Sequence, residues 1–458
     1  MDNTEEIKYS SNTHLSYGLG GFLTNFMYAA MTVRIIFFYE NILFLDIVLI
    51  GIAFSIFGIW NAINDPLIGY ISDKKTRFTE RYGRRLPWFL ASAIPCCLFY
   101  LLIFTVPFSD TLSMFLWLIL TICLFELAYS TWCTNYIALF PEKFRSHKER
   151  TKVAGINTIT GQFGIALGIL IPPLIIISDN LESYVNAAFV VMLISLIIAL
   201  LMIPGMREDE ELRSLELKLA EQEKESFIKT FKFAIKQKNL VIFLFAFLAH
   251  QILTFMMLAS IPFWTVYILR SDNPTGTETI LAAVFLVAGL VSVPLWIKIG
   301  RSYGNRKGFM CGTILTTIFF IPLLFLSDLL FTIITIALLG LSISAVWTLL
   351  YPCFSDVVDE SILVSNKRQE GMYNGIRMFI GRMGYVIQAI SFAVVHEMTY
   401  YQPGAETQAP PALWGIRVLM ALIPMIFNFA AFLALWKFYD LSPQKVKNIQ
   451  ETLKVRGF

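Results

Sequence analysis

Residues 61–88 read NAINDPLIGYISDKKTRFTERYGRRLPW, an apolar run that contains a carboxylate and ends in a cluster of basic residues. Asp65 lies inside the apolar run, and Pro66 follows it directly. The basic residues come next, at Lys74, Lys75, Arg77, Arg81, Arg84 and Arg85. Apolar segments flanked by Lys and Arg are typical of transmembrane helices that end at the cytoplasmic face of a membrane. The sequence here therefore predicts a transmembrane helix with an ionisable group in it.

The composition of the whole chain supports this interpretation. Its 458 residues are 56% hydrophobic and 15% charged, whereas soluble globular domains have about 25% charged residues. The apolar runs are too long for two or three soluble domains. All six cysteines lie inside apolar stretches and lack the spacing of metal ligands, so we expect neither a disulfide framework nor a metal site.

Twelve stretches reach the length of about 20 apolar residues that a helix needs to cross a bilayer. They lie at 17–39, 46–71, 87–106, 112–140, 153–177, 184–204, 239–269, 279–298, 309–327, 330–355, 371–396 and 413–438. We therefore predict an all-α polytopic membrane protein with twelve transmembrane helices.

Basic residues are distributed unevenly between the loops that join these stretches. The loops after even-numbered spans hold about 25 of the 36 Lys and Arg residues, whereas the loops after odd-numbered spans hold only Arg270. Since Lys and Arg concentrate on the cytoplasmic side, we predict a multi-pass protein of the cell membrane with both termini in the cytoplasm. The basic loops would also contact anionic membrane lipid.

The two halves of the chain resemble each other. ERYGRRLPW (80–88) follows the second span and RSYGNRKGF (301–309) follows the eighth, so a Tyr-Gly pair occupies the same place in each half. Two parallel six-span repeats describe the major facilitator architecture. We predict an N-terminal six-helix bundle, a cytoplasmic linker, a C-terminal six-helix bundle and a cytoplasmic tail, over 1–205, 206–238, 239–439 and 440–458.

Apart from residues at the ends of the spans, such as Lys298 and Lys437, few residues charged at neutral pH lie inside the predicted spans, namely Arg34, Asp65, Glu126, Arg377, Arg382 and Arg417. Such residues are costly in a membrane and usually face a cavity or a partner. Asn61, Asn64 and Asp65 project from about one helical turn, and their oxygens suit a small hard cation or a proton on the carboxylate. In the alternative, Asp65 pairs with an arginine and fixes helix packing. The arginines at 34, 377 and 417 either extend toward the membrane surface or hold helices together. No role is predicted for Glu126.

Several motifs together resemble the glycoside–pentoside–hexuronide:cation symporter family, the relatives of bacterial melibiose permease, within the major facilitator superfamily. They are LSYGLGGF (15–22), WNAINDPLIGYISD (60–73), YIALFPEKFRSHKERTKVAG (136–155), SDVVDESILVSNKRQEGMYNGIRMFIGR (355–382) and GIRVLMALIP (415–424). The resemblance implies a transporter that moves a solute together with Na⁺, Li⁺ or H⁺.

The resemblance also implies site residues. The family's cation site falls on Asn61, Asn64, Asp65 and Ser130. Its sugar-site positions fall on Thr24, Asn25, Cys133, Ile137, Thr158 and Trp347, and the lysine that links the two sites corresponds to Arg382. Charges that close the inner gate correspond to Arg150, Asp356, Asp359, Arg368 and Glu370.

This chain departs from melibiose permease at acidic positions. That relative has aspartates where Asn25, Asn61 and Cys133 stand here, and its sugar-site arginine corresponds to Thr158. Because three acids are absent while Arg382 is present, we expect a sugar-like solute that is anionic, such as a uronide or another acidic glycoside. A lysolipid or another amphiphile is the alternative solute, since vertebrate lysolipid symporters resemble the same family. The coupling ion is predicted to be H⁺ or Na⁺.

We expect transport by alternating access, in which a cation or proton neutralises Asp65 before solute binds and the two halves rock. The other interpretation is a membrane sensor or scaffold that does not transport. No buried Ser/His pair, paired-His metal site or phosphate-binding loop is found, which disfavours an enzyme or an ATP-driven pump. We expect no cofactor and no nucleic-acid partner, and the family fold is complete as a monomer.

Overall fold

The computed structural model describes residues 9–72, 79–144, 147–177, 180–209, 232–365 and 370–455, and their regular structure is helical. The chain forms two compact units. Unit 1 comprises Met1–Leu49 and Ser55–Glu223, and unit 2 comprises Ile50–Phe54 and Lys224–Phe458. Most of the predicted linker lies outside the described residues, as do Arg368 and the side chains of Asp65 and Glu370.

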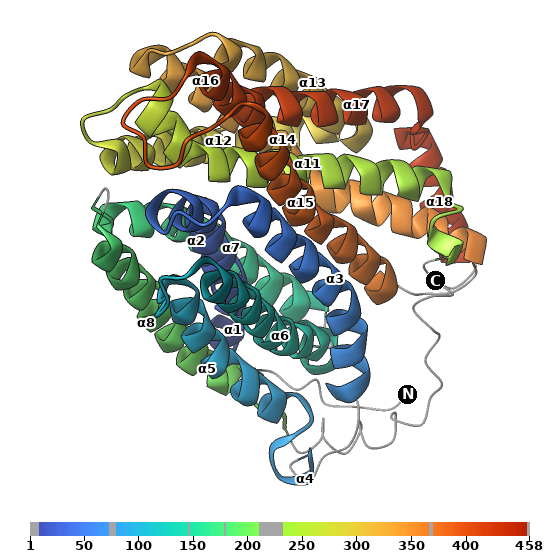
Figure 1. The fold of residues 1–458 in the computed structure, drawn as a ribbon. Helices are drawn as coiled ribbons and strands as arrows, with labels where there is room; N and C mark the ends of the chain where they lie inside the picture. The colour runs from blue at the N-terminus through green and yellow to red at the C-terminus, as the bar shows by residue number, and fades with distance from the viewer. Residues whose placement is uncertain are drawn as a thin grey trace. The chain divides into compact units, whose positions relative to one another are not determined.

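The described helices of the first half run from α1 to α8 (Figure 1). Their bounds are α1 Ser11–Gly18, α2 Gly20–Phe37, the π-helical turn η1 Phe38–Ile42, α3 Ile47–Ser72, α4 Thr79–Tyr82, α5 Arg85–Phe104, α6 Thr111–Lys143, α7 His147–Ile175 and α8 Leu181–Met206.

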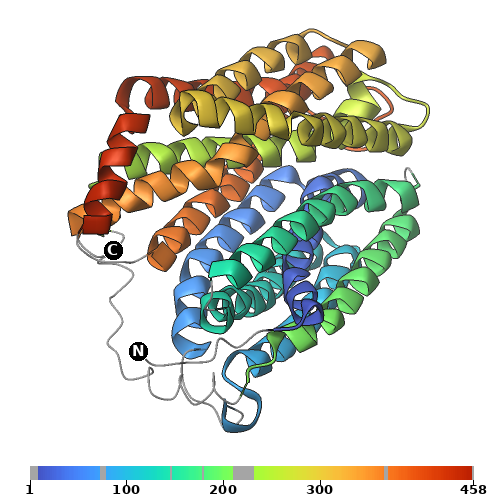
Figure 2. The ribbon, with the colours of Figure 1, turned by 180° about the vertical axis from the view of Figure 1, so that it is seen from behind.

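The second half contains longer helices and more interruptions. Its elements are α11 Lys238–Phe263, the π-helical turn η2 Trp264–Ile268, α12 Pro274–Tyr303, α13 Asn305–Phe320, the 3₁₀ turn η3 Ile321–Leu324, α14 Leu329–Ser365, α15 Glu370–Met398, α16 Pro410–Arg417, the π-helical turn η4 Val418–Leu422, α17 Ile423–Phe438 and α18 Pro443–Val455. α18 turns away from the direction of α17 and packs on α14 (Figure 2).

Eleven helical stretches among the described residues are long and apolar enough to cross a membrane. α3 is a further helix, and its apolar part with described side chains, Ile47–Asn61, is shorter. Every predicted span falls on a helix, so the predicted all-α membrane fold is confirmed. Some helices exceed the predicted stretch, α14 by about ten residues, because a helix continues past its apolar segment.

Several membrane-spanning helices begin with a side-chain cap, and three of them share one geometry. Asp110, Asn180 and Asn273 precede α6, α8 and α12, and each side chain accepts a hydrogen bond from the backbone N–H three residues later. The distances are 2.9, 3.2 and 3.0 Å. Such caps satisfy N–H groups that a helix leaves without partners, and Pro274 adds a residue suited to the first turn. These polar residues therefore set where the spans start.

The first span of each half ends in the same way. α2 passes into η1 and α11 passes into η2, and in both cases a residue with positive φ follows. These residues are Phe44, with φ of +55°, and Arg270, with φ of +48°. The internal repeat seen in the sequence thus extends to a matching backbone conformation at the end of the first span.

The two Tyr-Gly pairs also match in conformation. Gly83 has φ of +88° and Gly304 has φ of +89°, a region that favours glycine. A side chain at Gly83 would overlap Glu208, whose carboxylate accepts the backbone N–H groups of Arg84 and Arg85 at 2.8 and 2.5 Å. A side chain at Gly304 would meet Pro443. In each half, the residue that such a side chain would meet, Glu208 or Pro443, comes just after the sixth span of that half.

α2 and α7 pack closely because glycines line the crossing. Gly164 and Gly168 on α7 form a GxxxG spacing, and a Cβ at either one would lie 2.5 Å from a backbone oxygen of α2, on Phe22 or Phe26. Small residues at such spacing allow helix backbones to approach each other inside a membrane. This contact fixes the first span of unit 1 against the fifth.

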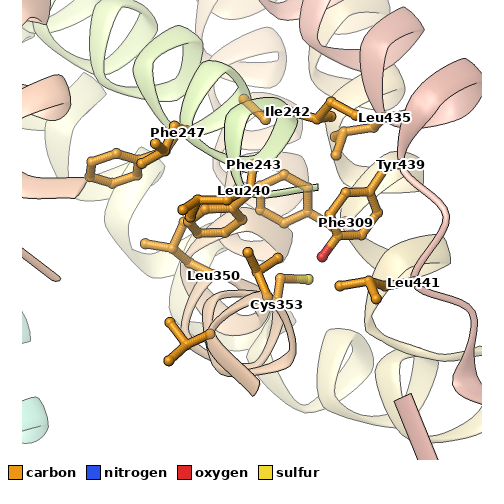
Figure 3. Close-up of a cluster of buried hydrophobic side chains, with 14 of the residues drawn as sticks. Leu240, Ile242, Phe243, Phe247, Phe309, Leu350, Cys353, Leu435, Tyr439 and Leu441 are labelled. Carbon is orange, nitrogen blue, oxygen red and sulfur yellow. The ribbon is translucent and has the colours of Figure 1, made fainter. Parts of the chain in front are cut away.

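The core of unit 2 gathers where α11 begins, and Figure 3 shows part of it. Its large members come from α11, α13, α14, α15, α17 and the segment after α17. They include Phe243, Phe247, Phe309, Leu350, Tyr373, Leu435 and Tyr439. α18 adds Ile449 and Leu453, which are 5% and 7% exposed. The C-terminal helix is therefore part of the packed unit.

Candidate functional site

α3 carries the predicted cation residues of unit 1. Asn61 and Asn64 are both buried, with 2% and 1% of their surface exposed. They lie three residues apart, so they share one side of the helix. Asp65 follows Asn64 in α3.

Among the described residues, the amide of Asn64 has no hydrogen-bond partner at either its oxygen or its nitrogen. A buried polar group left unpaired costs about 1–3 kcal/mol by mutational data. An amide oxygen of this kind is a ligand that a hard cation accepts. Asn64 therefore fits the chemistry of a cation site in α3.

α6 brings a carboxylate to the predicted ligand Ser130. Glu126 is fully buried, and Ser130 Oγ donates a hydrogen bond to its Oε1 at 2.8 Å. Tyr28 of α2 donates its hydroxyl to the other carboxylate oxygen, Oε2. The sequence assigned no role to Glu126, yet it touches a residue of the predicted cation site.

A hydrogen bond joins α3 and α6 at this point. Trp60 Nε1 donates to the carbonyl oxygen of Cys123 at 3.1 Å. Asn64 follows Trp60 by one turn, and Glu126 follows Cys123 by nearly one turn. The structure therefore brings the polar residues of the two helices into the same region of unit 1.

The predicted substrate residues of unit 1 lie on three helices. Thr24 and Asn25 on α2 donate hydrogen bonds to the carbonyl oxygens of Gly20 and Gly21, at 2.6 and 2.9 Å. Thr158 on α7 is exposed and donates to Ala154 O, and Cys133 on α6 is buried. Tyr129 of α6 donates to the carbonyl of Thr24 at 3.0 Å, which links α6 to α2.

Trp347 and Arg382 belong to unit 2. Trp347 on α14 meets the ring of Phe285 edge-on, with ring centres 5.7 Å apart. Arg382 lies half-buried on α15. The two units are described separately, so a solute site shared by residues of both stays a prediction.

Arg377 on α15 is held in an aromatic cage. Its guanidinium carbon lies 5.1 Å from the ring centres of Phe247, Tyr351 and Phe354. Asn374 accepts a hydrogen bond from Nη2 at 2.8 Å. Cations over aromatic faces are stabilised by about 0.5–2 kcal/mol. These contacts join α15 to α11 and α14, which favours a packing role for Arg377.

Arg417 also holds helices together. Its Nη1 donates to the carbonyl oxygen of Leu326 at 2.7 Å and its Nη2 donates to Ser327 Oγ at 2.8 Å. Its guanidinium carbon lies 5.6 Å from the ring centre of Trp264. Arg417 thus binds carbonyls at the end of η3 and just after it.

The predicted inner-gate residues are partly described. Arg150 is exposed and donates from Nε to the carbonyl oxygen of Phe144 at 2.6 Å. Asp356 on α14 accepts a hydrogen bond from Asn305 at 3.0 Å, and Asp359 lies on the same helix. The gate's ion pairs stay a prediction, since Arg368 and the side chain of Glu370 lie outside the described residues.

Sequence reasoning missed a polar network next to Asp359. Lys445 of α18 pairs with Glu360 at 2.7 Å and with Asp440 at 2.8 Å. Asn239 at the start of α11 donates to the same two carboxylates, at 2.7 and 2.6 Å. Glu360 lies inside a family motif, but nothing in the sequence shows that the chain turns at Asp440 and brings Lys445 back to it.

The contacts of this network stabilise the charges of Asp440 and Lys445. Burial alone would raise the pKa of the Asp440 carboxyl, but hydrogen bonds from Lys445 and Asn239 lower it overall. Burial would likewise lower the pKa of Lys445, and its bonds to Asp440 and Glu360 raise it. A lowered carboxyl pKa stabilises the folded state above the unfolded value of about 4. That stability is lost as pH falls through the lower folded value.

Replacing Lys445 by Met is expected to loosen α18. Partly exposed ion pairs contribute about 0.2–1 kcal/mol each, and Lys445 makes two, so amide hydrogen exchange in α18 should rise about two- to thirtyfold at neutral pH. Lys447→Met is the matched control, since the pair of Lys447 with Glu451 is exposed and measures 3.9 Å. Equal exchange in both variants would contradict an anchoring role for Lys445.

Residues 16–442 match a family model described as MFS/sugar transport protein. The chain belongs to this family. The predicted resemblance to cation-coupled sugar symporters is confirmed, and this transporter is a multi-pass membrane protein. Membership makes transport, rather than catalysis, the activity of the chain.

Relatives cover most of the transporter. The "glucuronide carrier protein homolog" of Escherichia coli is 24% identical over 96% of this chain and 94% of its own length. The "sodium-dependent lysophosphatidylcholine symporter 1" of Xenopus tropicalis is 23% identical over 87% of this chain and 81% of its own. A crystal structure of a D-xylose–proton symporter has a TM-score of 0.67 at 14% identity, covering 94% of this chain and 98% of its own. That last likeness shows the fold.

Proposed function

We propose that this transporter carries a sugar-like solute together with a monovalent cation by alternating access. The observation that carries the proposal is the polar cluster of unit 1. There Asn64 is buried with no hydrogen-bond partner among the described residues, and Glu126 accepts a hydrogen bond from Ser130. Polar groups inside membrane spans mark ion and substrate pathways more often than packing sites. Membership of a transport family and a symporter relative support the same function.

Both H⁺ and Na⁺ are candidates for the coupling ion. Asn61 replaces an acid of melibiose permease, which weakens the α3 site for Na⁺ and leaves Asp65 able to carry a proton. The Xenopus relative named sodium-dependent supports Na⁺ instead. Uptake measured in Na⁺-free medium and at clamped pH distinguishes the two.

An anionic solute fits the predicted binding positions. Asn25, Cys133 and Thr158 carry no charge, and Arg382 supplies a cation on α15. A charge-assisted hydrogen bond to a carboxylate contributes about 1.5–3 kcal/mol. The relative named a glucuronide carrier homolog supports the same class of solute.

Competition during uptake into proteoliposomes tests the solute class. A phenyl glucuronide is expected to compete about tenfold more strongly than the matching neutral glucoside. Arg382→Gln should remove that preference, because it removes the charge and retains a polar side chain. Stronger competition by the neutral glucoside would overturn the anionic class.

A lysolipid is the second candidate solute. The name of the Xenopus relative, which matches over 87% of this chain, includes lysophosphatidylcholine. The same uptake assay includes lysophosphatidylcholine below its micellar concentration as a competitor. Competition by the lysolipid alone, with none by either sugar, would favour this second function.

We place the transporter in the cell membrane with both termini in the cytoplasm, from the distribution of Lys and Arg. In the proposed cycle, Arg150, Asp356, Asp359, Arg368 and Glu370 form ion pairs that close the cytoplasmic end while the cavity faces outward. The transporter would work as a monomer.

A further inference from the structure

We propose that Glu126 adds a second carboxylate to the proposed cation site, and that the cation is Na⁺. The inference rests on the proposed cation symport and adds a residue to it. Asp65 is the one acid among the four predicted cation residues, since the others are Asn61, Asn64 and Ser130. The buried acid Glu126 on α6 adds a carboxylate to them.

The hydrogen bond from Ser130 connects Glu126 to the proposed cation site. A serine hydroxyl has one proton to donate and two lone pairs that accept. Since Ser130 gives its proton to Glu126 Oε1 at 2.8 Å, its lone pairs can serve as cation ligands. The adjacent Thr131 instead donates to the carbonyl of Leu127, as hydroxyls in helices commonly do. Glu126 is thus a positioning residue that also adds negative charge.

Two hydroxyl groups hold the carboxylate of Glu126 in place. Hydroxyls of Tyr28 and Ser130 donate to its two oxygens, one to each. Glu126 is fully buried, so water screens its interaction with a cation little.

Helix geometry places Asn64 on the side of α3 that faces Glu126 on α6. Trp60 and Asn64 are four residues apart and therefore share one face of α3, and Trp60 bonds to Cys123 on α6. On α6, Cys123, Glu126 and Ser130 also share one face, at intervals of three and four residues. α3 and α6 run in the same direction, because one span separates them. Asn64, about 6 Å beyond Trp60, therefore faces the α6 segment that holds Glu126.

Na⁺-dependent thermal stability of the purified full-length protein in detergent tests the proposal. The probe is NaCl, titrated against choline chloride at constant ionic strength. Glu126→Gln is expected to weaken the apparent Na⁺ affinity about 10- to 100-fold, as removal of a group that supports a metal ligand does. Ser130→Ala should weaken it similarly, and the double variant should lose little more, since the two act as a unit.

Glu278→Gln is the matched control. Glu278 is a buried carboxylate of unit 2, 2% exposed, that also accepts a hydroxyl hydrogen bond, from Thr265 at 3.2 Å. Replacing Glu278 by Gln should leave the apparent Na⁺ affinity within about twofold of the wild-type value. If Glu126→Gln does not fold, Glu126→Asp tests whether the contact with Ser130 supports Na⁺ binding. The variant keeps a carboxylate, but its shorter side chain moves that group away from Ser130.

The outcomes separate this inference from the proposed symport. If Glu126→Gln titrates like wild type while Asn64→Ala loses the Na⁺ response, Glu126 is not part of the site and the symport proposal stands. If wild type shows no Na⁺ response, the inference is overturned, and proton coupling becomes the test of symport. Equal weakening by Glu126→Gln and Glu278→Gln would also overturn it.

Discussion

Asp65→Asn is expected to abolish uphill accumulation of the solute while solute exchange across the membrane stays measurable. Asn keeps the size and polarity of the side chain but removes the charge that a coupling ion neutralises. Asp65 follows the buried Asn64 in α3, where the cation ligands are proposed to lie. Without that charge, the cation gradient no longer drives the cycle, and solute reaches only its equilibrium distribution.

The measurement compares two assays on the same proteoliposomes. One follows accumulation against a solute gradient with an imposed cation gradient, and the other follows exchange of labelled for unlabelled solute. Glu278→Gln again serves as a control for loss of a buried acid and should accumulate solute normally. Uphill accumulation by the Asp65→Asn variant would refute its coupling role.

Gly164→Leu is expected to prevent stable folding of unit 1. A Cβ at Gly164 would lie 2.5 Å from the oxygen and 3.0 Å from the Cα of Phe22, and neither backbone atom can rotate away. Overpacking a close contact costs about 1–3 kcal/mol or more, and the leucine adds three further carbons at the crossing. α2 would have to separate from α7, and the two helices carry Thr24, Asn25 and Thr158.

Thermal unfolding and size-exclusion profiles of purified variants measure this effect. Gly155 lies on the same helix, and among the described residues no atom beyond the adjacent backbone of that helix lies within 4 Å of a Cβ placed there. Gly155→Ala is therefore expected to be neutral or stabilising by up to about 1 kcal/mol, since glycine is unfavourable within helices. A Gly164→Leu variant as stable as Gly155→Ala would show that the crossing is not tightly packed.

Apolar length and the distribution of Lys and Arg were enough to predict the helices. Each span needs a local run of apolar residues, so the information lies within about 20 neighbouring positions. The α3 residues Asn61, Asn64 and Asp65 stood out for the same reason, as polar groups in an apolar run. Motif resemblance then supplied Ser130, which no local pattern marks.

The contacts of Glu126 could not be predicted in this way. Its partners are Ser130 on its own helix and Tyr28 on α2, and only the packing of α2 against α6 brings Tyr28 to the carboxylate. The aromatic cage of Arg377 has the same origin, since its three rings come from two other helices. A charged residue in an apolar span indicates a free-energy cost that neighbouring groups must offset. Only the fold determines which groups these are.

The contact between Gly83 and Glu208 has a practical consequence for any attempt to express the two halves of the protein as separate fragments. Glu208 covers Gly83 and binds the first amides of α5, although it comes after the last helix of the first half. Two fragments intended for co-expression must therefore be separated downstream of Glu208. A fragment that stops at Met206 would expose those amides and leave the third span without its cap.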